Sequence, residues 1–269
     1  MTPIRVAAGQ AESVPRDVAA NVATAVSLVT SAADQGARVV VLPELFLTGY
    51  DEASWVHDAS LGLDDEVLAP LSEVARSRSV VVVVGAAVRR ALDESTLSVL
   101  VVDSDGEVSA PYDKQHLSGA ERGFFAPGDH GATVVVDGWD LALGVCYDGC
   151  FPEHALAATA GGAAAYLVPA AYYVGAEHRR DVYYAARALD NGIYVVFAGL
   201  TGTCGSGSFC GGSAVYDPEG RPLHRAGDES PAVVVADLDP DVVRRTQREH
   251  PMARDRRDSL GTRLRVDVS

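Results

Sequence analysis

The chain has 269 residues, 48% of them hydrophobic, so it is long and apolar enough to bury a large core. Its 37 acidic and 22 basic residues give a formal net charge of -15. This argues against a nucleic-acid partner, because such proteins need a basic surface. No apolar run approaches the roughly 20 residues of a membrane span, and the first residues, MTPIRVAAGQ, lack the long apolar stretch of a secretion signal. We therefore expect a single domain over 1–269, in the cytoplasm and with no membrane partner.

Hydrophobic periodicity and turn residues predict alternating strands and helices. In chain order we expect a strand (4–9), a helix (16–34), a strand (37–44), a helix (64–77), a strand (80–88), a hairpin turning at 105–106, two strands (132–136 and 140–145), a helix from Pro152, a strand (165–170), a helix (177–190), a strand (193–199), a hairpin turning at 217–220 and a last strand (232–238). This order is typical of an α/β chain. The many apolar strands and the hairpins indicate two mixed sheets packed together, with helices on their outer faces.

The four cysteines do not resemble a disulfide scaffold in a chain of this length. Cys146 and Cys150 are four residues apart, and Cys204 and Cys210 are six apart. Structural zinc sites use tighter knuckles, so the spacing predicts no metal site.

Reactive or charged residues stand at the ends of three expected strands: Glu44 in VVVLPE, Lys114 in YDK and Cys146 in LALGVC. Such groups are costly to bury unless they are paired or used. The carboxyl ends of strands are also where sites gather in α/β folds. Glu44, Lys114 and Cys146 are therefore expected to converge.

These three residue types can together attack a carbonyl group. The thiol is the nucleophile, the carboxylate takes its proton, and the ammonium holds the oxyanion. Histidine is the more usual base, and His116 and His154 are the candidates. His154 reads as a surface residue, and His116 could line the site without being the base. The alternative for all three residues is a structural ion pair and a buried thiol.

Three motifs occur in the same chain: LPELFLTGY around Glu44, YDKQHL around Lys114 and GVCYDGCFPE around Cys146. With RALDNGIYVV at 187–196 and GGSAVYDPEG at 211–220, they resemble the nitrilase superfamily of carbon–nitrogen hydrolases, over almost the whole length of the chain. Several motifs in register are more specific than any one of them. The resemblance implies a four-layer α-β-β-α sandwich, with two mixed sheets face to face and helices outside.

The resemblance also implies roles for the site residues. Cys146 is the nucleophile, Glu44 the general base and acid, and Lys114 the oxyanion stabiliser, with the backbone N–H of Tyr147 as a second donor. Glu121 matches the family's second glutamate, which orients the lysine, although it stands one residue nearer to the lysine than is usual. The alternative interpretation of Glu121 is an acidic side chain in a solvated loop. No metal or organic cofactor is implied.

The turn after Cys146 should present its N–H groups beside the sulfur and favour the thiolate. Asp148 is expected to point elsewhere and to pair with Arg187, which the family also carries. Cys150 is expected to be a bystander.

The order Cys146-Tyr147-Asp148 resembles amidases and carbamoylases, because nitrilases of this superfamily have Cys-Trp-Glu there. The resemblance is strongest to bacterial aliphatic amidases acting on small ω-amino amides, which makes a small aliphatic primary amide, with an ω-amino or ω-guanidino tail, the expected substrate alongside water. An N-carbamoyl amine or amino acid, or an ω-amide of a dicarboxylic acid, is the alternative. A catalytically silent binding member is a further alternative, against which the intact catalytic residues argue.

Several residues are candidates for the substrate pocket: Tyr50, His116, Tyr172, Tyr173 and Glu177. The tyrosines and the carboxylate could frame a cationic tail. Alternatively, Tyr172 and Tyr173 merely pack between elements. Two arginines at 179 and 180 follow closely, so a carboxylate-bearing substrate stays open.

Family members usually form homodimers, and by analogy we expect one here. The segment over about 250–269 is expected at the subunit contact.

Overall fold

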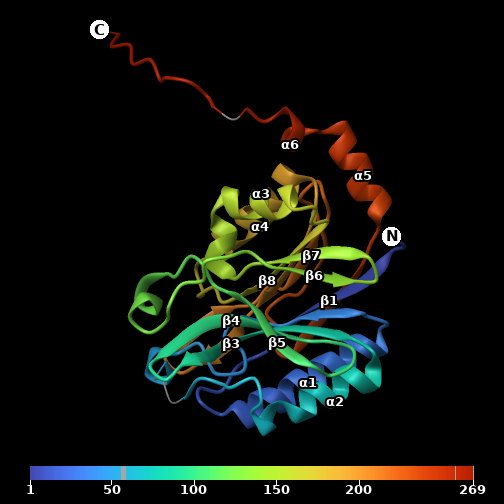
Figure 1. The fold of residues 1–269 in the computed structure, drawn as a ribbon, viewed down its shortest axis with the longest axis vertical. Coiled ribbons are helices and arrows are strands. Elements are labelled where there is room, and N and C mark those ends of the chain that lie inside the picture. The colour runs from blue at the N-terminus through green and yellow to red at the C-terminus, as the bar shows by residue number, and fades with distance from the viewer. Residues whose placement is uncertain (56–58, 258, 269) are drawn as a thin grey trace.

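Two six-stranded mixed sheets lie face to face at the centre of the fold (Figure 1). The structure is a computed structural model that describes residues 1–55, 59–257 and 259–268. The first sheet has the order β14 (Ala232–Leu238), β1 (Ile4–Gln10), β2 (Val39–Val41), β3 (Val81–Ala91), β4 (Glu94–Val102) and β5 (Val108–Asp113). The second has the order β13 (Pro222–Arg225), β12 (Ala214–Tyr216), β9 (Tyr194–Gly199), β8 (Ala165–Ala170), β7 (Trp139–Leu143) and β6 (Thr133–Val136).

Parallel strands form the middle of each sheet. Strand β2 lies between β1 and β3, with Val39 opposite Val6 on one side and Val81 on the other. In the second sheet, β8 is parallel to both β7 and β9. Strands β2, β8 and β9 are buried along their whole length, as expected of parallel strands covered on both faces.

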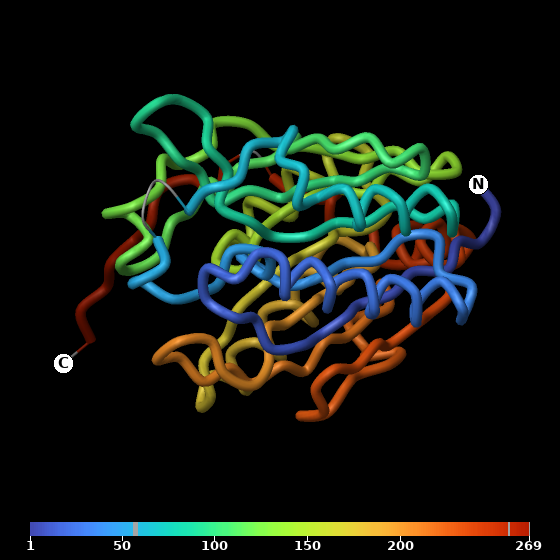
Figure 2. The backbone as a smooth tube through the Cα atoms, turned by 90° about the horizontal axis from the view of Figure 1, so that it is seen from below, coloured from blue at the N-terminus to red at the C-terminus, as the bar shows by residue number. Residues whose placement is uncertain are grey.

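Helices cover the outer face of each sheet and complete four layers. Helices α1 (Val18–Asp34) and α2 (Ala69–Arg78) lie side by side on the first sheet (Figures 1 and 2). Helices α3 (Pro152–Ala160) and α4 (Glu177–Asn191) cover the second. Asp17 caps the N-terminus of helix α1, and its carboxylate accepts the N–H of Ala20 at 3.0 Å. The helix turns buried apolar side chains toward the sheet. The expected α-β-β-α sandwich is confirmed.

The strand expected over 37–44 is shorter, because β2 ends at Val41. Proline at 43 has no N–H to donate, and Leu45 turns with a positive φ of 47°. The short 3-10 helices η1 (Glu52–Ser54) and η3 (Glu66–Leu68) follow before α2. From the sequence we did not expect the hairpin of β10 (Thr201–Cys204) and β11 (Gly207–Cys210), nor helices α5 (Pro240–Glu249) and α6 (Met252–Asp255).

The chain beyond α5 runs through the short helix α6 (Met252–Asp255) into a tail that extends away from the sandwich (Figure 1). Positions 258 and 269 of the expected subunit-contact segment lie outside the described residues. No helix among residues 1–55, 59–257 and 259–268 is long and apolar enough to cross a membrane.

Gly85 is where β3 touches the turn that carries Glu44. A Cβ at Gly85 would lie 2.5 Å from Leu45 N, 2.6 Å from Glu44 Cα and 2.7 Å from Pro43 O, and all three of these atoms belong to the backbone. We expect Gly85→Ala to lower the free energy of unfolding by about 1–3 kcal/mol, because the turn must move to admit the methyl group. Urea denaturation measures this. The matched control is Gly131→Ala, where a Cβ would meet no atom within 4 Å; equal stability of the two variants would contradict the expectation.

Candidate active site

The Glu44 carboxyl is fully buried at the end of the short strand β2. The positive φ of Leu45 turns the chain sharply after it, and Gly85 N donates to Pro43 O at 3.0 Å to hold the turn on β3. Glu44 Oε1 accepts from the ammonium of Lys114 at 2.6 Å. Glu44 Oε2 is buried and has no hydrogen-bond partner within the described part of the chain, so one oxygen is left to exchange a proton.

Lys114 follows β5 and is also fully buried. Its Nζ is 2.6 Å from Glu44 and 2.8 Å from each carboxylate oxygen of Glu121. Three acceptor oxygens therefore meet the three N–H groups of one ammonium. The sequence expectation that Glu44 and Lys114 converge is confirmed, and Glu121 joins them in spite of its shorter spacing.

Glu121 lies in the 3-10 helix η4 (Gly119–Gly123) and is buried. Its Oε2 accepts the N–H of Ser118 at 2.8 Å, and its Oε1 accepts the hydroxyl of Tyr50 at 2.6 Å. Because every one of these contacts orients the carboxylate toward Lys114, the alternative of a solvated loop acid is wrong.

Cys146 opens the 3-10 helix η5 (Cys146–Cys150), with two residues between it and the end of β7. Its φ of 43° lies in the left-handed region, an uncommon conformation for a residue with a side chain and one that recurs at functional sites. The hydroxyl of Tyr184 donates to Cys146 O at 2.9 Å, and the thiol donates to Ala171 O at 3.6 Å. The N–H of Tyr147 stands in the first turn of this helix, where such groups lack an acceptor within the helix.

The thiol and the Glu44 carboxyl are neighbours, and each changes the acidity of the other. Burial raises the pKa of Glu44 to about 7; Glu121 adds to this effect, and Lys114 and the nearby Cys146 thiol oppose it. Burial and the charge of Glu44 raise the pKa of the Cys146 thiol well above its ordinary value. Both effects favour the protonated thiol over the thiolate, and they outweigh any opposite effect of the helix N–H groups.

Lys114 keeps its charge in this buried position. Burial alone lowers the pKa of its ammonium, but the charges of Glu44, Cys146 and Glu121 outweigh that effect and raise it. One lysine between two glutamates leaves an excess negative charge when both are ionised. That excess adds to the effect of burial in keeping a proton on Cys146 or on Glu44.

Aromatic rings gather beside Glu121. The ring of Tyr50 meets Trp55, Tyr173 and Phe209 edge to face at centroid distances of 5.2, 6.2 and 5.6 Å. Tyr173 stacks on Phe209 at 4.8 Å and is half exposed. Burial and the charges of Glu44, Glu52, Glu121 and Asp51 raise the pKa of Tyr173, so four acidic side chains act on its hydroxyl.

The other pocket candidates have different surroundings. The hydroxyl of Tyr172 lies 3.5 Å from Cys150 Sγ and 3.3 Å from the hydroxyl of Tyr184, which places it behind the nucleophile. Glu177 begins α4, and hydrogen bonds from the backbone of Gly175 and from its own N–H lower the pKa of its carboxyl.

Two expectations beside the nucleophile are wrong. His154 is not a surface residue: it is buried, with hydrogen bonds to the hydroxyls of Tyr112 (2.8 Å) and Tyr166 (2.9 Å). Asp148 does not pair with Arg187, which donates to Asp190 at 3.2 Å. It accepts instead from the hydroxyl of Tyr112 at 2.7 Å.

His116 lies against Asp148 and not against the thiol. Its Nδ1 is 2.8 Å from Asp148 Oδ1, and its ring stacks on Phe151 with centroids 4.0 Å apart. This contact does not make it a base for Cys146.

Sequence reasoning missed Tyr184, Tyr112 and Phe209. Nothing in helix α4 singled out Tyr184, which reaches the nucleophile across 38 residues of sequence. Phe209 had a usable signal, since Gly205-Ser206 separates two short alternating segments in the manner of a tight hairpin turn.

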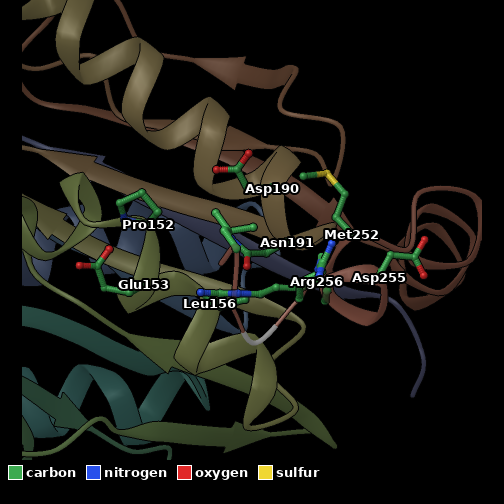
Figure 3. Close-up of a pocket in the computed structure, with 11 residues that line it drawn as sticks. Pro152, Glu153, Leu156, Asp190, Asn191, Met252, Asp255 and Arg256 are labelled. Atoms are coloured by element: carbon green, nitrogen blue, oxygen red, sulfur yellow. The ribbon is translucent and has the colours of Figure 1, made fainter. Parts of the chain in front are cut away.

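A cavity of about 710 Å³ lies away from these residues, between α3, the end of α4 and the C-terminal segment (Figure 3). Pro152, Glu153 and Leu156 face Asp190 and Met252 across it. No group of three or more histidine, cysteine or acidic side chains placed to hold a metal ion occurs among the residues that the structure describes.

The sequence profile of the carbon-nitrogen hydrolase family matches residues 5–248. This chain belongs to that family. It is an enzyme that hydrolyses carbon–nitrogen bonds, in the amidase branch of the nitrilase superfamily.

Its relatives include an (R)-stereoselective amidase of a Pseudomonas species, 31% identical over 90% of this chain and 87% of the relative. The human omega-amidase NIT2 is 30% identical over 89% and 90%. The amidase of Nesterenkonia sp. AN1, from the nitrilase superfamily, superimposes with a TM-score of 0.84 at 32% identity, with 94% of each chain covered. One structure of that amidase carries the acetamide moiety of fluoroacetamide covalently added at its active site cysteine.

The raised pKa of Glu44 predicts how stability depends on pH. Because the folded carboxyl holds its proton up to about pH 7, against 4.5 ordinarily, its protonated form stabilises the fold fully below pH 4.5. That contribution is lost as the pH rises through about 7. We therefore expect Glu44→Gln to gain about 2–3 kcal/mol of unfolding free energy relative to the parent between pH 5 and pH 8. Urea denaturation at both pH values checks this, and a difference independent of pH would contradict it.

Proposed function

We propose that the enzyme is a cysteine-dependent amidohydrolase that converts a small aliphatic primary amide to an acid and ammonia through a thioester. The observation that carries the proposal is the neighbouring pair of the Cys146 thiol and a Glu44 carboxyl whose pKa is about 7. A group with that pKa both accepts and returns a proton near neutral pH.

In the first half-reaction, Cys146 Sγ attacks the amide carbonyl carbon while the thiol proton passes to Glu44. The carbonyl π electrons move onto oxygen, which Lys114 and the Tyr147 N–H stabilise. The tetrahedral intermediate then collapses: the C–N bond breaks, Glu44 returns the proton to nitrogen, and ammonia leaves a thioester on Cys146.

In the second half-reaction, Glu44 takes a proton from water as the water oxygen attacks the thioester carbonyl. The C–S bond breaks, the proton returns to sulfur, and the carboxylic acid is released.

Lys114 has a defined part in both steps. Its three N–H groups face carboxylate oxygens at rest. Protonation of Glu44 weakens its hold on the ammonium and turns one N–H toward the oxyanion, while Glu121 and Tyr50 keep the ammonium in place.

A cationic tail, such as an ω-amino or ω-guanidino group, is the substrate feature that the surroundings favour. The half-exposed Tyr173 ring offers a face for a cation, and Asp51 and Glu52 add negative charge near it. The ω-amides of dicarboxylic acids are less favoured, because the guanidinium of Arg180 already donates to groups within the protein and not to a substrate carboxylate. Its Nε donates to Asp181 at 2.7 Å and its Nη1 to Gly211 O at 2.8 Å.

Ammonia release by the purified enzyme tests the reaction. The substrates are 5-aminopentanamide, 4-guanidinobutanamide, a glutaramate-type ω-amide, an N-carbamoyl amine and a simple nitrile. We expect the cationic amides to be preferred, and Cys146→Ala to lower kcat at least about 10⁴-fold, because covalent catalysis has no substitute here. Normal turnover by Cys146→Ala would exclude the mechanism.

Two variants of one loop separate substrate recognition from catalysis. Tyr173→Ala should lower kcat/KM for the cationic amides about tenfold, as expected when one cation–π contact is lost, and leave propionamide hydrolysis within twofold. Val174→Ala, which shortens an exposed neighbouring side chain, is the control.

In the ammonia-release assay, preference for a carbamoyl or dicarboxylate substrate would keep the mechanism and overturn this assignment of the pocket. Silence on all substrates would favour the catalytically silent binding member.

We also propose that the enzyme is a homodimer. Val182 and Leu189 on α4 are exposed apolar side chains, as is Met252 on α6, which lines the cavity of Figure 3, and a second copy of the chain would cover them. Size-exclusion chromatography with light scattering should give twice the 28.1 kDa of one chain. A monomer at micromolar concentration would contradict this proposal.

A further inference from the structure

Asp148 makes four hydrogen bonds close to the nucleophile, yet the mechanism above does not use it. It is fully buried. Its Oδ2 accepts from the backbone N–H of Val145 at 3.0 Å and from the hydroxyl of Tyr112 at 2.7 Å. Its Oδ1 accepts from the backbone N–H of His116 at 2.9 Å and lies 2.8 Å from His116 Nδ1.

These contacts join the two segments that carry the reacting groups. Val145 directly precedes Cys146, and its N–H sets the start of the left-handed turn. His116 stands two residues after Lys114, and Tyr112 two residues before it. One carboxylate therefore ties the turn of the nucleophile to both sides of the lysine, across the space between the two sheets.

We propose that Asp148 is a positioning residue that fixes Cys146 and the Tyr147 N–H relative to Lys114, with His116 as its replaceable donor. This inference rests on the proposed thioester mechanism. It goes beyond it because Asp148 and His116 neither touch the substrate nor move a proton.

An electrostatic role at the sulfur is the competing explanation. The groups that most affect the pKa of the thiol are Glu44, Lys114 and Glu121, and Asp148 is not among them. The four donors to Asp148 neutralise much of its charge locally. The remaining role of Asp148 is to hold Cys146 in position relative to Lys114. Misplacement of a reacting group by about 1 Å can slow a reaction about 100-fold.

His116 allows the proposal to be tested without emptying the core. It is partly exposed, with 34% of its side chain accessible, and it lines two cavities of about 470 and 440 Å³. Trimming it therefore opens no sealed void. Asparagine places an amide N–H close to where the imidazole carries Nδ1, so His116→Asn retains the donor to Asp148, whereas His116→Ala removes it.

The experiment measures kcat, KM and thermal stability for His116→Ala, His116→Asn and Asp148→Asn on the substrate that the parent enzyme prefers. We expect His116→Ala to lower kcat about tenfold through the loss of one bond to a charged acceptor, and His116→Asn to restore it to within about threefold. Asp148→Asn should lower kcat about 100-fold. KM should stay within about threefold throughout, since the contacts to substrate are unchanged.

Tyr166→Phe is the matched control, because it removes a hydroxyl from the same buried cluster through His154 and leaves Asp148 untouched. It should lower stability and keep kcat. Equal activity of the alanine and asparagine variants at 116, or losses of kcat that follow thermal stability across all four variants, would overturn the proposal. If Asp148→Asn does not fold, the two His116 variants decide.

The kcat values of Cys146→Ala and of the positioning variants separate this proposal from the proposed function, and alkylation of Cys146 by iodoacetamide, followed by intact mass, checks that the thiol stays accessible. If Cys146→Ala turns over normally, the thioester mechanism fails whatever Asp148 does. If Cys146→Ala is inactive while both Asp148→Asn and His116→Ala keep parental kcat, only the positioning proposal fails. Alkylation of the folded Asp148→Asn variant should persist, because its thiol and pocket remain.

Discussion

One buried ion pair network organises the active site: the ammonium of Lys114 held between the carboxylates of Glu44 and Glu121. Taking three ionisable groups out of water is costly, and their mutual attraction offsets that cost only when the geometry is good. Here three carboxylate oxygens lie within 2.8 Å of one nitrogen. Removing Lys114 would leave two buried carboxylates without their cation, so chain segments distant in sequence are held at one point.

The same network explains the chemistry. Two carboxylates and one ammonium leave an excess negative charge, and this charge, together with burial, raises the pKa values of Glu44 and Cys146. The site therefore holds one proton that moves between sulfur and carboxyl. Proton transfer within the pair leaves its total charge unchanged, which suits a site that water barely reaches. Attack on a carbonyl then requires no separate base.

The architecture supplies the geometry in which this network forms. Glu44 and Cys146 follow strands from different sheets, and each lies at a turn with a positive φ, at Leu45 in one case and at Cys146 itself in the other. Such turns are strained and persist only where neighbours hold them. Gly85 supports the first by close backbone contact, and Asp148 and Tyr184 hold the second through hydrogen bonds.

The sequence by itself determined the four layers, the order of most strands and the convergence of Glu44, Lys114 and Cys146. Strand periodicity is local, and motifs of adjacent residues carry their chemistry with them. Tertiary structure alone decided the partners of Asp148, the burial of His154 and the ring of Phe209 beside Tyr173. Those side-chain contacts join residues 12 to 42 positions apart in the first two cases and 36 in the third. No local pattern encodes them, because they exist only once the two sheets have packed and brought their loops to one edge.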